Sequence, residues 1–337
     1  MTPPAGPRPV VRTLPLALAA ALLLASPALA LPGGAGAEGP RDAALLYLAE
    51  RSEGEDGFPS ASIAPYLVEA AVAAGLDPAL WPPVAGGALG RIVVPEPGGP
   101  LLALLRPAHA LALAGVPLGD VSGRDLASEI RASFDGTQFG DPALLNDDAF
   151  AILALAADGA SPLDARLAAA GRFLAARQAG GWSWAEGGPP GTDMTGIVLH
   201  ALAWTQTPYD AAAAWAFLET TKTSGGGWGE SPAGDANCQS TVWGLRATAL
   251  LGTPPPAADW DFLLALQAPD GGFRHQPGHP SDPLCTAEAA TLLGLAAVGG
   301  IAFSDVSGRS QPETPLAALL ALLLGASWKG RRQGEKK

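Results

Sequence analysis

The sequence contains few cysteines, few aromatic residues and relatively little positive charge. Its 337 residues include 2 cysteines, and Phe, Trp and Tyr together make up 6%. Lys and Arg number 20 against 32 Asp and Glu, which gives a formal charge of −12. Nucleic acid requires a basic surface to meet its phosphates. The charge therefore argues against nucleic acid as a partner and against general attraction to anionic lipid.

Small and aliphatic residues are plentiful. Hydrophobic residues make up 48% of the chain, and Ala and Leu dominate them. Both residues favour helix. Gly (43) and Pro (33) are also abundant, but they recur at intervals between apolar runs. This arrangement predicts helices separated by turns.

The N-terminal segment has the pattern of an export signal. Arg8 and Arg12 precede an apolar run over 14–25, and residues 28–30 read Ala-Leu-Ala, a small-x-small cleavage site. The pattern is typical of a signal peptide over 1–30. An uncleaved membrane anchor is the alternative, although the run is shorter than the ~20 residues of a spanning helix. We therefore expect an exported protein, whether periplasmic, secreted or at the cell surface.

A repeated unit occupies most of the remaining chain. An aromatic residue follows a Gly-rich turn at Trp182, Trp228 and Phe273, in steps of roughly 45 residues. Stepping back reaches Phe139 and then, beyond a degenerate copy, Phe58. After each turn come a polar loop, a cluster of small polar residues and a long apolar helix.

These units predict two kinds of helix. The helix before a turn, as over 164–178, is amphipathic and should lie outside. The helix after a turn, as over 196–204, has no polar face and should be buried. Counting over 41–300 gives about six units. An open array would need polar capping repeats, which the sequence lacks, so we predict an all-α ring of helical hairpins, an (α/α)6 toroid.

The ends flank this ring. We assign residues 31–40 to a linker and 301–337 to a C-terminal tail. The tail has an apolar run over 316–328 followed by basic residues. Positive charge after an apolar run is typical of a cytoplasmic stop. The tail is thus either a membrane attachment or a terminal helix docked on the ring.

The turns carry a resemblance to known proteins. Phe-Leu-x3-Gln-x2-Gly-Trp over 173–182 resembles the QW motif of squalene–hopene and oxidosqualene cyclases, and the copies ending at Trp228 and Phe273 are similar. The same toroid occurs in protein prenyltransferase β subunits and in cobalamin carriers. The resemblance implies the (α/α)6 fold over 41–300 and is weak evidence for function.

The acid motifs of those cyclases are incomplete here. Hopene cyclases use DxDD, and Leu145-Asn146-Asp147-Asp148 lacks the first acid. Oxidosqualene cyclases use DCTAE, and residues 284–288 have Leu in place of that acid. Protonating an alkene requires a strong, positioned acid, and aromatic residues that would steady cations are scarce. Asp147 and Asp148 remain the catalytic candidates.

The resemblance also implies a zinc site in the prenyltransferases, formed by Asp, Cys and His. Asp235 and Cys238 echo their D-x-C, but no His lies just ahead of Cys285, and His275 and His279 fall in a Pro-rich loop rather than on a helix. The cobalamin carriers need a second domain. We therefore predict no metal and no cofactor. The two cysteines could pair in an exported protein, although equivalent points on packed helices lie ~8–10 Å apart, which favours two buried thiols.

The polar clusters before the inner helices form the candidate binding site. If the inner helices run parallel, their N-termini open at one mouth, and six carboxylates would line it: Asp147, Asp148, Asp193, Asp235, Asp282 and Glu288. Arg246 lies within an inner helix and should pair with one of them, because a buried Arg is costly unless paired. The alternative role of these clusters is helix capping. The turn aromatics are expected to act as staples between outer helices.

The function expected from these features is binding. We predict a non-catalytic, exported toroid that binds a small molecule, a glycan or a protein at its mouth or surface. One alternative is a terpenoid cyclase-like or prenyltransferase-like enzyme that uses Asp147 or Asp148. The other is a structural module held at the cell surface by the tail.

Overall fold

The computed structural model describes residues 38–53, 61–253 and 255–297. This part of the chain is all-helical, with isolated β-bridges in the loops. In chain order the helices are α2 (Glu38–Glu53), η1 (Ala61–Ile63), α3 (Ala64–Ala73), η2 (Leu89–Arg91), α4 (Leu101–Leu113), α5 (Leu126–Ala132), α6 (Leu145–Ala157), α7 (Ala165–Ala175), α8 (Thr192–Thr205), α9 (Ala211–Thr221), α10 (Cys238–Leu250), α11 (Ala257–Ala265) and α12 (Pro283–Ala297).

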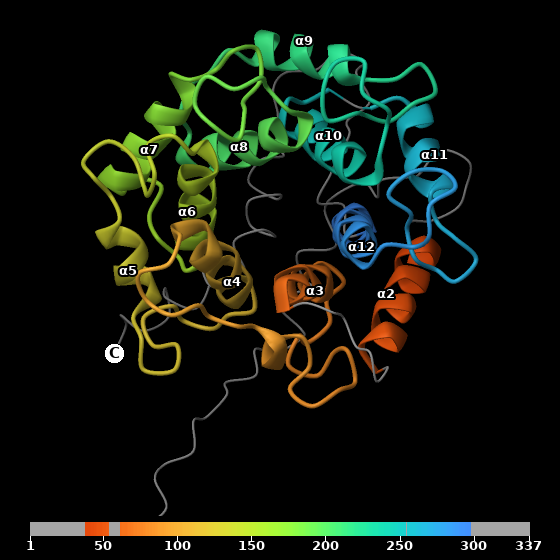
Figure 1. Cartoon of the computed structure of the whole chain (residues 1–337), viewed down its shortest axis with the longest axis horizontal. Coiled ribbons are helices and arrows are strands. Elements are labelled where there is room, and N and C mark those ends of the chain that lie inside the picture. Colours follow the sequence, from red (N-terminus) through yellow and green to blue (C-terminus); the bar gives the residue numbers. More distant parts are fainter. Residues whose placement is uncertain (1–37, 54–60, 254, 298–337) are drawn as a thin grey trace, which may run out of the picture.

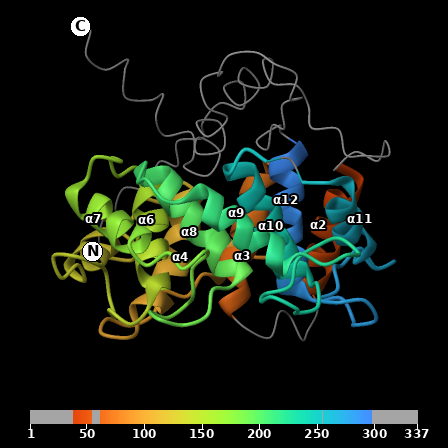
Figure 2. The ribbon, with the colours of Figure 1, turned by 90° about the horizontal axis from the view of Figure 1, so that it is seen from above.

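The helices form two concentric rings (Figure 1). The inner ring runs α3, α4, α6, α8, α10 and α12, each helix packs on the next, and α12 packs on α3 to close the circle. Helices α2, α5, α7, α9 and α11 lie outside, and α2 packs on α12. Seen from the side, the helices form a single layer (Figure 2). The predicted α/α toroid is confirmed. Between α3 and α4 the chain has only η2 in place of an outer helix, where the degenerate copy was expected.

The inner helices are more deeply buried than the outer ones, as the apolar pattern predicts. Thirteen of the fourteen residues of α8 are buried, whereas α9 buries only Ala214, Leu218 and Thr221. Small residues let the inner helices approach closely. A Cβ on Gly294 of α12 would lie 2.7 Å from the Ala73 carbonyl oxygen of α3. Glycine at this position therefore permits the contact that closes the ring.

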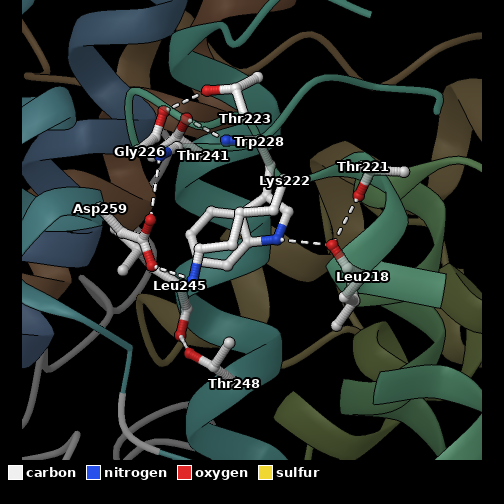
Figure 3. A network of polar contacts seen from close by, with 11 residues as sticks. Leu218, Thr221, Lys222, Thr223, Gly226, Trp228, Thr241, Leu245, Thr248 and Asp259 are labelled. Atoms are coloured by element: carbon white, nitrogen blue, oxygen red, sulfur yellow. Dashed lines mark hydrogen bonds and ion pairs between the residues drawn. The ribbon is translucent and has the colours of Figure 1, made fainter. Parts of the chain in front are cut away.

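The Gly-aromatic turn joins an outer helix to the inner helix that follows it, as the Trp228 turn does for α9 and α10 (Figure 3). Trp228 is fully buried, and its indole Nε1 donates to the Leu218 carbonyl of α9 at 3.1 Å. Its backbone N–H donates to Thr241 Oγ1 of α10 at 3.1 Å. The aromatic residues are thus staples, as predicted, but they act within a hairpin rather than between outer helices.

Contacts between neighbouring outer helices come from other residues of the motif. Gln178, after α7, donates to the Asp210 carbonyl at 2.7 Å and accepts from the Asp210 N–H at 2.9 Å. Gln267, after α11, donates to the Pro40 carbonyl of α2 at 2.8 Å. The glutamine of the motif therefore makes the same kind of link twice. Gln178 joins α7 to the start of α9, and Gln267 joins the last repeat to the first.

The inner helices run parallel, as the mouth prediction requires. The first amide of α6, at Leu145, donates to the Trp184 carbonyl at 2.9 Å. Thr192 and Cys238 donate in the same way to the Glu230 and His275 carbonyls, each at 2.9 Å. The N-termini of α6, α8 and α10 are therefore each bonded to the loop of the next repeat, and they lie at one face of the ring.

Several sequence predictions concern segments outside the described residues, including the signal peptide over 1–30 and the tail over 301–337. Helix α2 begins at Glu38, inside the segment expected to be a linker. None of the described helices combines the length and hydropathy that a membrane span needs. Cys238 and Cys285 are both buried free thiols, with Cys238 Sγ 3.6 Å from the Cys285 carbonyl oxygen.

The Thr241 hydroxyl offers a test of the staple. Replacing Thr241 by Val keeps the shape of the side chain but leaves the buried Trp228 N–H without an acceptor. We expect the free energy of unfolding to fall by about 1–3 kcal/mol, measured by urea denaturation. Thr248→Val is the matched control, because Thr248 is equally buried on α10 and only donates to the Leu245 carbonyl of its own helix, at 2.8 Å. Equal losses for the two variants would contradict the role given to the staple.

Candidate functional site in the interior of the ring

The staple fixes how each inner helix is rotated about its axis. Thr195, Thr241 and Thr286 occupy equivalent positions and accept from the N–H groups of Trp182, Trp228 and Phe273, at 3.0, 3.1 and 2.8 Å. These side chains point outward, toward the turns. Residues two and five positions further along lie on the opposite side of the helix, which faces the interior.

Polar and aromatic side chains gather on this interior face. Two positions after the staple residue stand Trp243 and Glu288, and five positions after it stand His200 and Arg246. The electrostatic neighbours of Arg246 include Glu69 of α3 and Arg106 of α4. Helix α4 lies across the ring from α10 (Figure 1). These side chains therefore meet inside the ring.

Glu69, Arg106 and His109 form the first half of this cluster. Glu69 Oε1 lies 3.7 Å from Arg106 Nη1 and 3.4 Å from His109 Nδ1. The Arg106 guanidinium lies over the rings of Tyr66 and Phe150, 4.3 and 4.5 Å from their centroids. Burial alone would raise the pKa of Glu69, but its interactions with His109 and the charge of Arg106 lower it to about 2.

Arg246 differs from Arg106 because it touches no carboxylate. It is 7% exposed and lies over the Trp243 ring at 4.2 Å. Within the described part of the chain, it has no hydrogen bond and no ion pair within 4 Å, and its Nε is buried without a partner. Burial lowers the pKa of Arg246, and the more distant charges of Glu69 and Glu288 oppose that shift. It is therefore a buried cation that no anion contacts.

His200 and Glu288 flank this cation. His200 Nδ1 lies 2.8 Å from the Gly196 carbonyl oxygen, and its ring meets Trp243 edge-on with 5.8 Å between centroids. Burial, followed by the charge of Arg246, lowers the pKa of His200 to about 3, so the ring is neutral at pH 7. Burial raises the pKa of Glu288 to about 6. One polar atom of each side chain, His200 Nε2 and Glu288 Oε2, is buried without a hydrogen-bond partner among the described residues.

Asp147 and Asp148 lie elsewhere. Asp148 Oδ1 accepts from the Phe139 N–H at 2.7 Å, and Asp147 Oδ2 accepts from the Asp141 N–H at 3.1 Å. Asp148 thus occupies the staple position at which three other inner helices carry Thr. Both carboxylates face the outer turn rather than the interior. Burial raises the pKa of Asp148 to about 8 and also raises that of Asp147.

The other predicted mouth carboxylates are also dispersed. Asp282 accepts from the Cys285 N–H at 2.9 Å and so caps α12, while Asp235 is exposed. Asp193 lies beside Glu230, whose Oε2 accepts from the Asp193 N–H at 3.1 Å. Burial and the Glu230 carboxylate raise the pKa of Asp193 well above its usual value. Of the predicted mouth residues, the structure therefore brings Arg246 and Glu288 within electrostatic range of each other, but it does not form a ring of six carboxylates.

Three residues of the interior were not predicted from the sequence. Tyr66, Glu69 and Arg106 belong to the first two units, where the turns are degenerate and give no register. Arg106 did carry a signal in the sequence, because it is the only charged residue of the apolar helix α4. Arg246 is likewise the only charged residue of α10. The described residues contain no group of three side chains suited to a metal ion.

Comparison with known proteins identifies relatives of the fold. No family model and no curated protein sequence matches the chain. The structure is similar to the type II terpene cyclase MstE from Scytonema in its apo form, with 15% identity, a TM-score of 0.52, and coverage of 78% of this chain and 98% of that one. A polysaccharide lyase matches with 13% identity and a TM-score of 0.53, over 79% and 97%. Candida albicans protein geranylgeranyltransferase-I is more distant, with 15% identity and a TM-score of 0.42; the match covers 60% of this chain and 66% of that one. At these identities the likeness establishes a shared α/α toroid and no activity.

The role of Asp148 predicts a pH dependence of stability. Its folded pKa of about 8 exceeds the unfolded value of ~3.9, so the folded state holds the proton more tightly. The free energy of unfolding should then fall as pH rises between these values, by up to ~1.4 kcal/mol per pH unit. Asp148→Thr installs the residue used by the sister repeats and should remove this contribution, as measured by thermal unfolding from pH 5 to pH 8.

Asp125→Asn serves as the control for that series. Asp125 is an exposed cap of α5 whose pKa is lowered, chiefly by the hydrogen bond from the Ser128 N–H. Its contribution to stability is therefore lost only in acid, below the range of the experiment. An Asp148→Thr profile that parallels the wild type from pH 5 to pH 8 would contradict the buried, protonated Asp148.

Proposed function

We propose that this chain is an exported, non-catalytic toroid that binds a small anionic molecule in the interior of the ring through Arg246. The observation that supports it is a guanidinium, 7% exposed, that no described carboxylate contacts. Leaving a buried charge uncompensated costs several kcal/mol. An anionic ligand would supply the missing contact, with charge-assisted hydrogen bonds to the guanidinium donors.

Solvent contact inside the ring supports entry of a ligand. The Arg106 side chain keeps 19% of its surface exposed and Glu69 keeps 11%, although both belong to inner helices. Tyr66, Asp193 and Gln239 are also only partly buried. These partly exposed residues, three of them near inner N-termini, favour access from the face where those N-termini meet.

The arrangement of acids and aromatic rings favours binding over terpenoid cyclisation. Asp147 and Asp148 are held by backbone amides of the turn, and the Glu288 carboxyl, with a pKa of about 6, is largely ionised at neutral pH. A cyclase needs a strong acid aimed at its substrate. The Tyr66, Phe150 and Trp243 rings each have a guanidinium over them. Likeness of fold to a terpene cyclase is therefore the main support for the enzymatic alternative.

Export remains part of the proposal because it depends on residues 1–30. N-terminal sequencing of the chain recovered from its native compartment would identify cleavage after Ala30. Deletion of residues 312–337 tests attachment through the tail: release into the medium supports an anchor, and unchanged fractionation contradicts it.

Replacing Arg246 by Met tests the binding site. In isothermal titration calorimetry, we expect the wild type to bind at least one of a series of small carboxylates. Arg246→Met should weaken that binding by about 30-fold or more, which corresponds to ~2 kcal/mol. The same change removes a buried unpaired charge, so the melting temperature without ligand should rise, by about 2–4 °C per kcal/mol gained.

The exposed Arg172 of α7 provides the control, because Arg172→Met removes the same charge outside the ring. It should alter neither binding nor the melting temperature. Failure of every carboxylate to bind the wild type, or undiminished binding by Arg246→Met, would refute the proposal.

A further inference from the structure

His200 presents an unused hydrogen-bond acceptor beside Arg246. Its Nδ1 lies 2.8 Å from the Gly196 carbonyl oxygen, which can only accept, so Nδ1 carries the proton and Nε2 carries the lone pair. The side chain is 2% exposed, and Nε2 has no partner among the described residues. Buried acceptors are normally satisfied, so this lone pair calls for a donor.

The groups around His200 restrict what that donor can be. The ring is perpendicular to the Trp243 ring, and the charged or titratable side chains that influence it are Arg246 and His109. No carboxylate is among them, and burial and the charge of Arg246 outweigh the hydrogen bond to the Gly196 carbonyl, which is the one influence that raises the pKa of His200. A ligand ammonium would also lie beside the Arg246 guanidinium, where like charges repel. A neutral hydroxyl avoids this repulsion and can donate to Nε2.

His200 and Arg246 stand at the same level of the ring. Each lies five positions after the staple residue of its helix, on the neighbouring helices α8 and α10. The axes of packed helices are ~8–10 Å apart, and both side chains contact the Trp243 ring: the His200 ring centroid is 5.8 Å and the Arg246 guanidinium 4.2 Å from its centroid. A compact molecule can therefore meet both groups at once.

We infer that the interior site is built for a small hydroxycarboxylate, whose carboxylate is held by Arg246 and whose hydroxyl donates to His200 Nε2. The inference rests on the proposed function. It adds the chemical class of the ligand and names the residue that recognises its hydroxyl group. His200 is then the specificity-determining residue, because a site with a buried acceptor discriminates against an analogue that lacks the matching donor.

Matched pairs of carboxylates test this inference. Glycolate and acetate, malate and succinate, and citrate and tricarballylate differ within each pair only by the hydroxyl. In calorimetric titrations of the full-length wild type, we expect at least one hydroxy acid to bind about 10-fold more tightly than its partner, which is the effect of one hydrogen bond to a buried group. Aspartate, with an ammonium in place of the hydroxyl of malate, should bind more weakly than malate.

Two substitutions assign the preference to His200. His200→Phe keeps an aromatic ring against Trp243 but removes the acceptor, so the 10-fold preference should vanish while the affinity for the deoxy acid stays the same. His200→Gln places an amide oxygen near the position of Nε2 and should restore the preference. Retained deoxy-acid affinity also shows that the variants fold.

The outcomes separate the two proposals. Equal binding of hydroxy and deoxy acids by the wild type, with loss of both in Arg246→Met, overturns the hydroxyl inference and leaves the proposed function intact. A preference that survives in His200→Phe overturns it as well, and so does tighter binding of aspartate than of malate. Failure of all six acids to bind overturns the proposed function itself.

Discussion

The rotation of each inner helix about its axis is the constraint on which the rest of this structure depends. A single hydrogen bond, from the N–H of the turn aromatic to a Thr or Asp oxygen, sets that rotation on α6, α8, α10 and α12. Because side chains recur every 3.6 residues, fixing one outward position also fixes the inward ones. The composition of the ring's interior therefore follows from where the turn is anchored.

The interior that results is unlike an apolar core. Two carboxylates and two guanidiniums lie inside the ring, but only Glu69 and Arg106 are within ion-pair distance. Glu288 influences both guanidiniums without touching either, and its raised pKa shows that their attraction does not fully offset burial. Exchanging these groups for apolar residues would be expected to stabilise the ring. Their presence at a cost in stability is the pattern found at functional sites.

The ring was predictable from the sequence because its signals are local. The Gly-aromatic turns at Trp182, Trp228 and Phe273 recur at a fixed spacing, and apolar helices follow them. The grouping of the site residues was not predictable in the same way, since it depends on contacts across the ring. Glu69 and Arg106 lie in units without a regular turn, so the sequence offered no register for them. Asp148 was misleading for a related reason. A carboxylate in the first turn of an inner helix can face either the interior or the outer turn, and its equivalence to Thr241 shows that Asp148 faces the turn.

The position of Arg246 shows that two residues of one helix can differ in whether they find a hydrogen-bond partner, depending on the direction they face. Thr241 and Arg246 share α10 and are both buried, yet the Thr241 hydroxyl accepts a hydrogen bond from the turn, whereas the Arg246 guanidinium lies over the Trp243 ring and has no hydrogen bond within the described chain. A position that faces outward finds a partner in its own repeat, whereas one that faces inward depends on side chains from other repeats. In four of the six repeats, the inward position equivalent to Arg246 carries Leu153, His200, Arg246 or Thr291, so the interior is asymmetric although the fold is nearly symmetric. That asymmetry is what the proposed site requires, because a ligand can be held in one orientation only if each of its functional groups meets a different side chain.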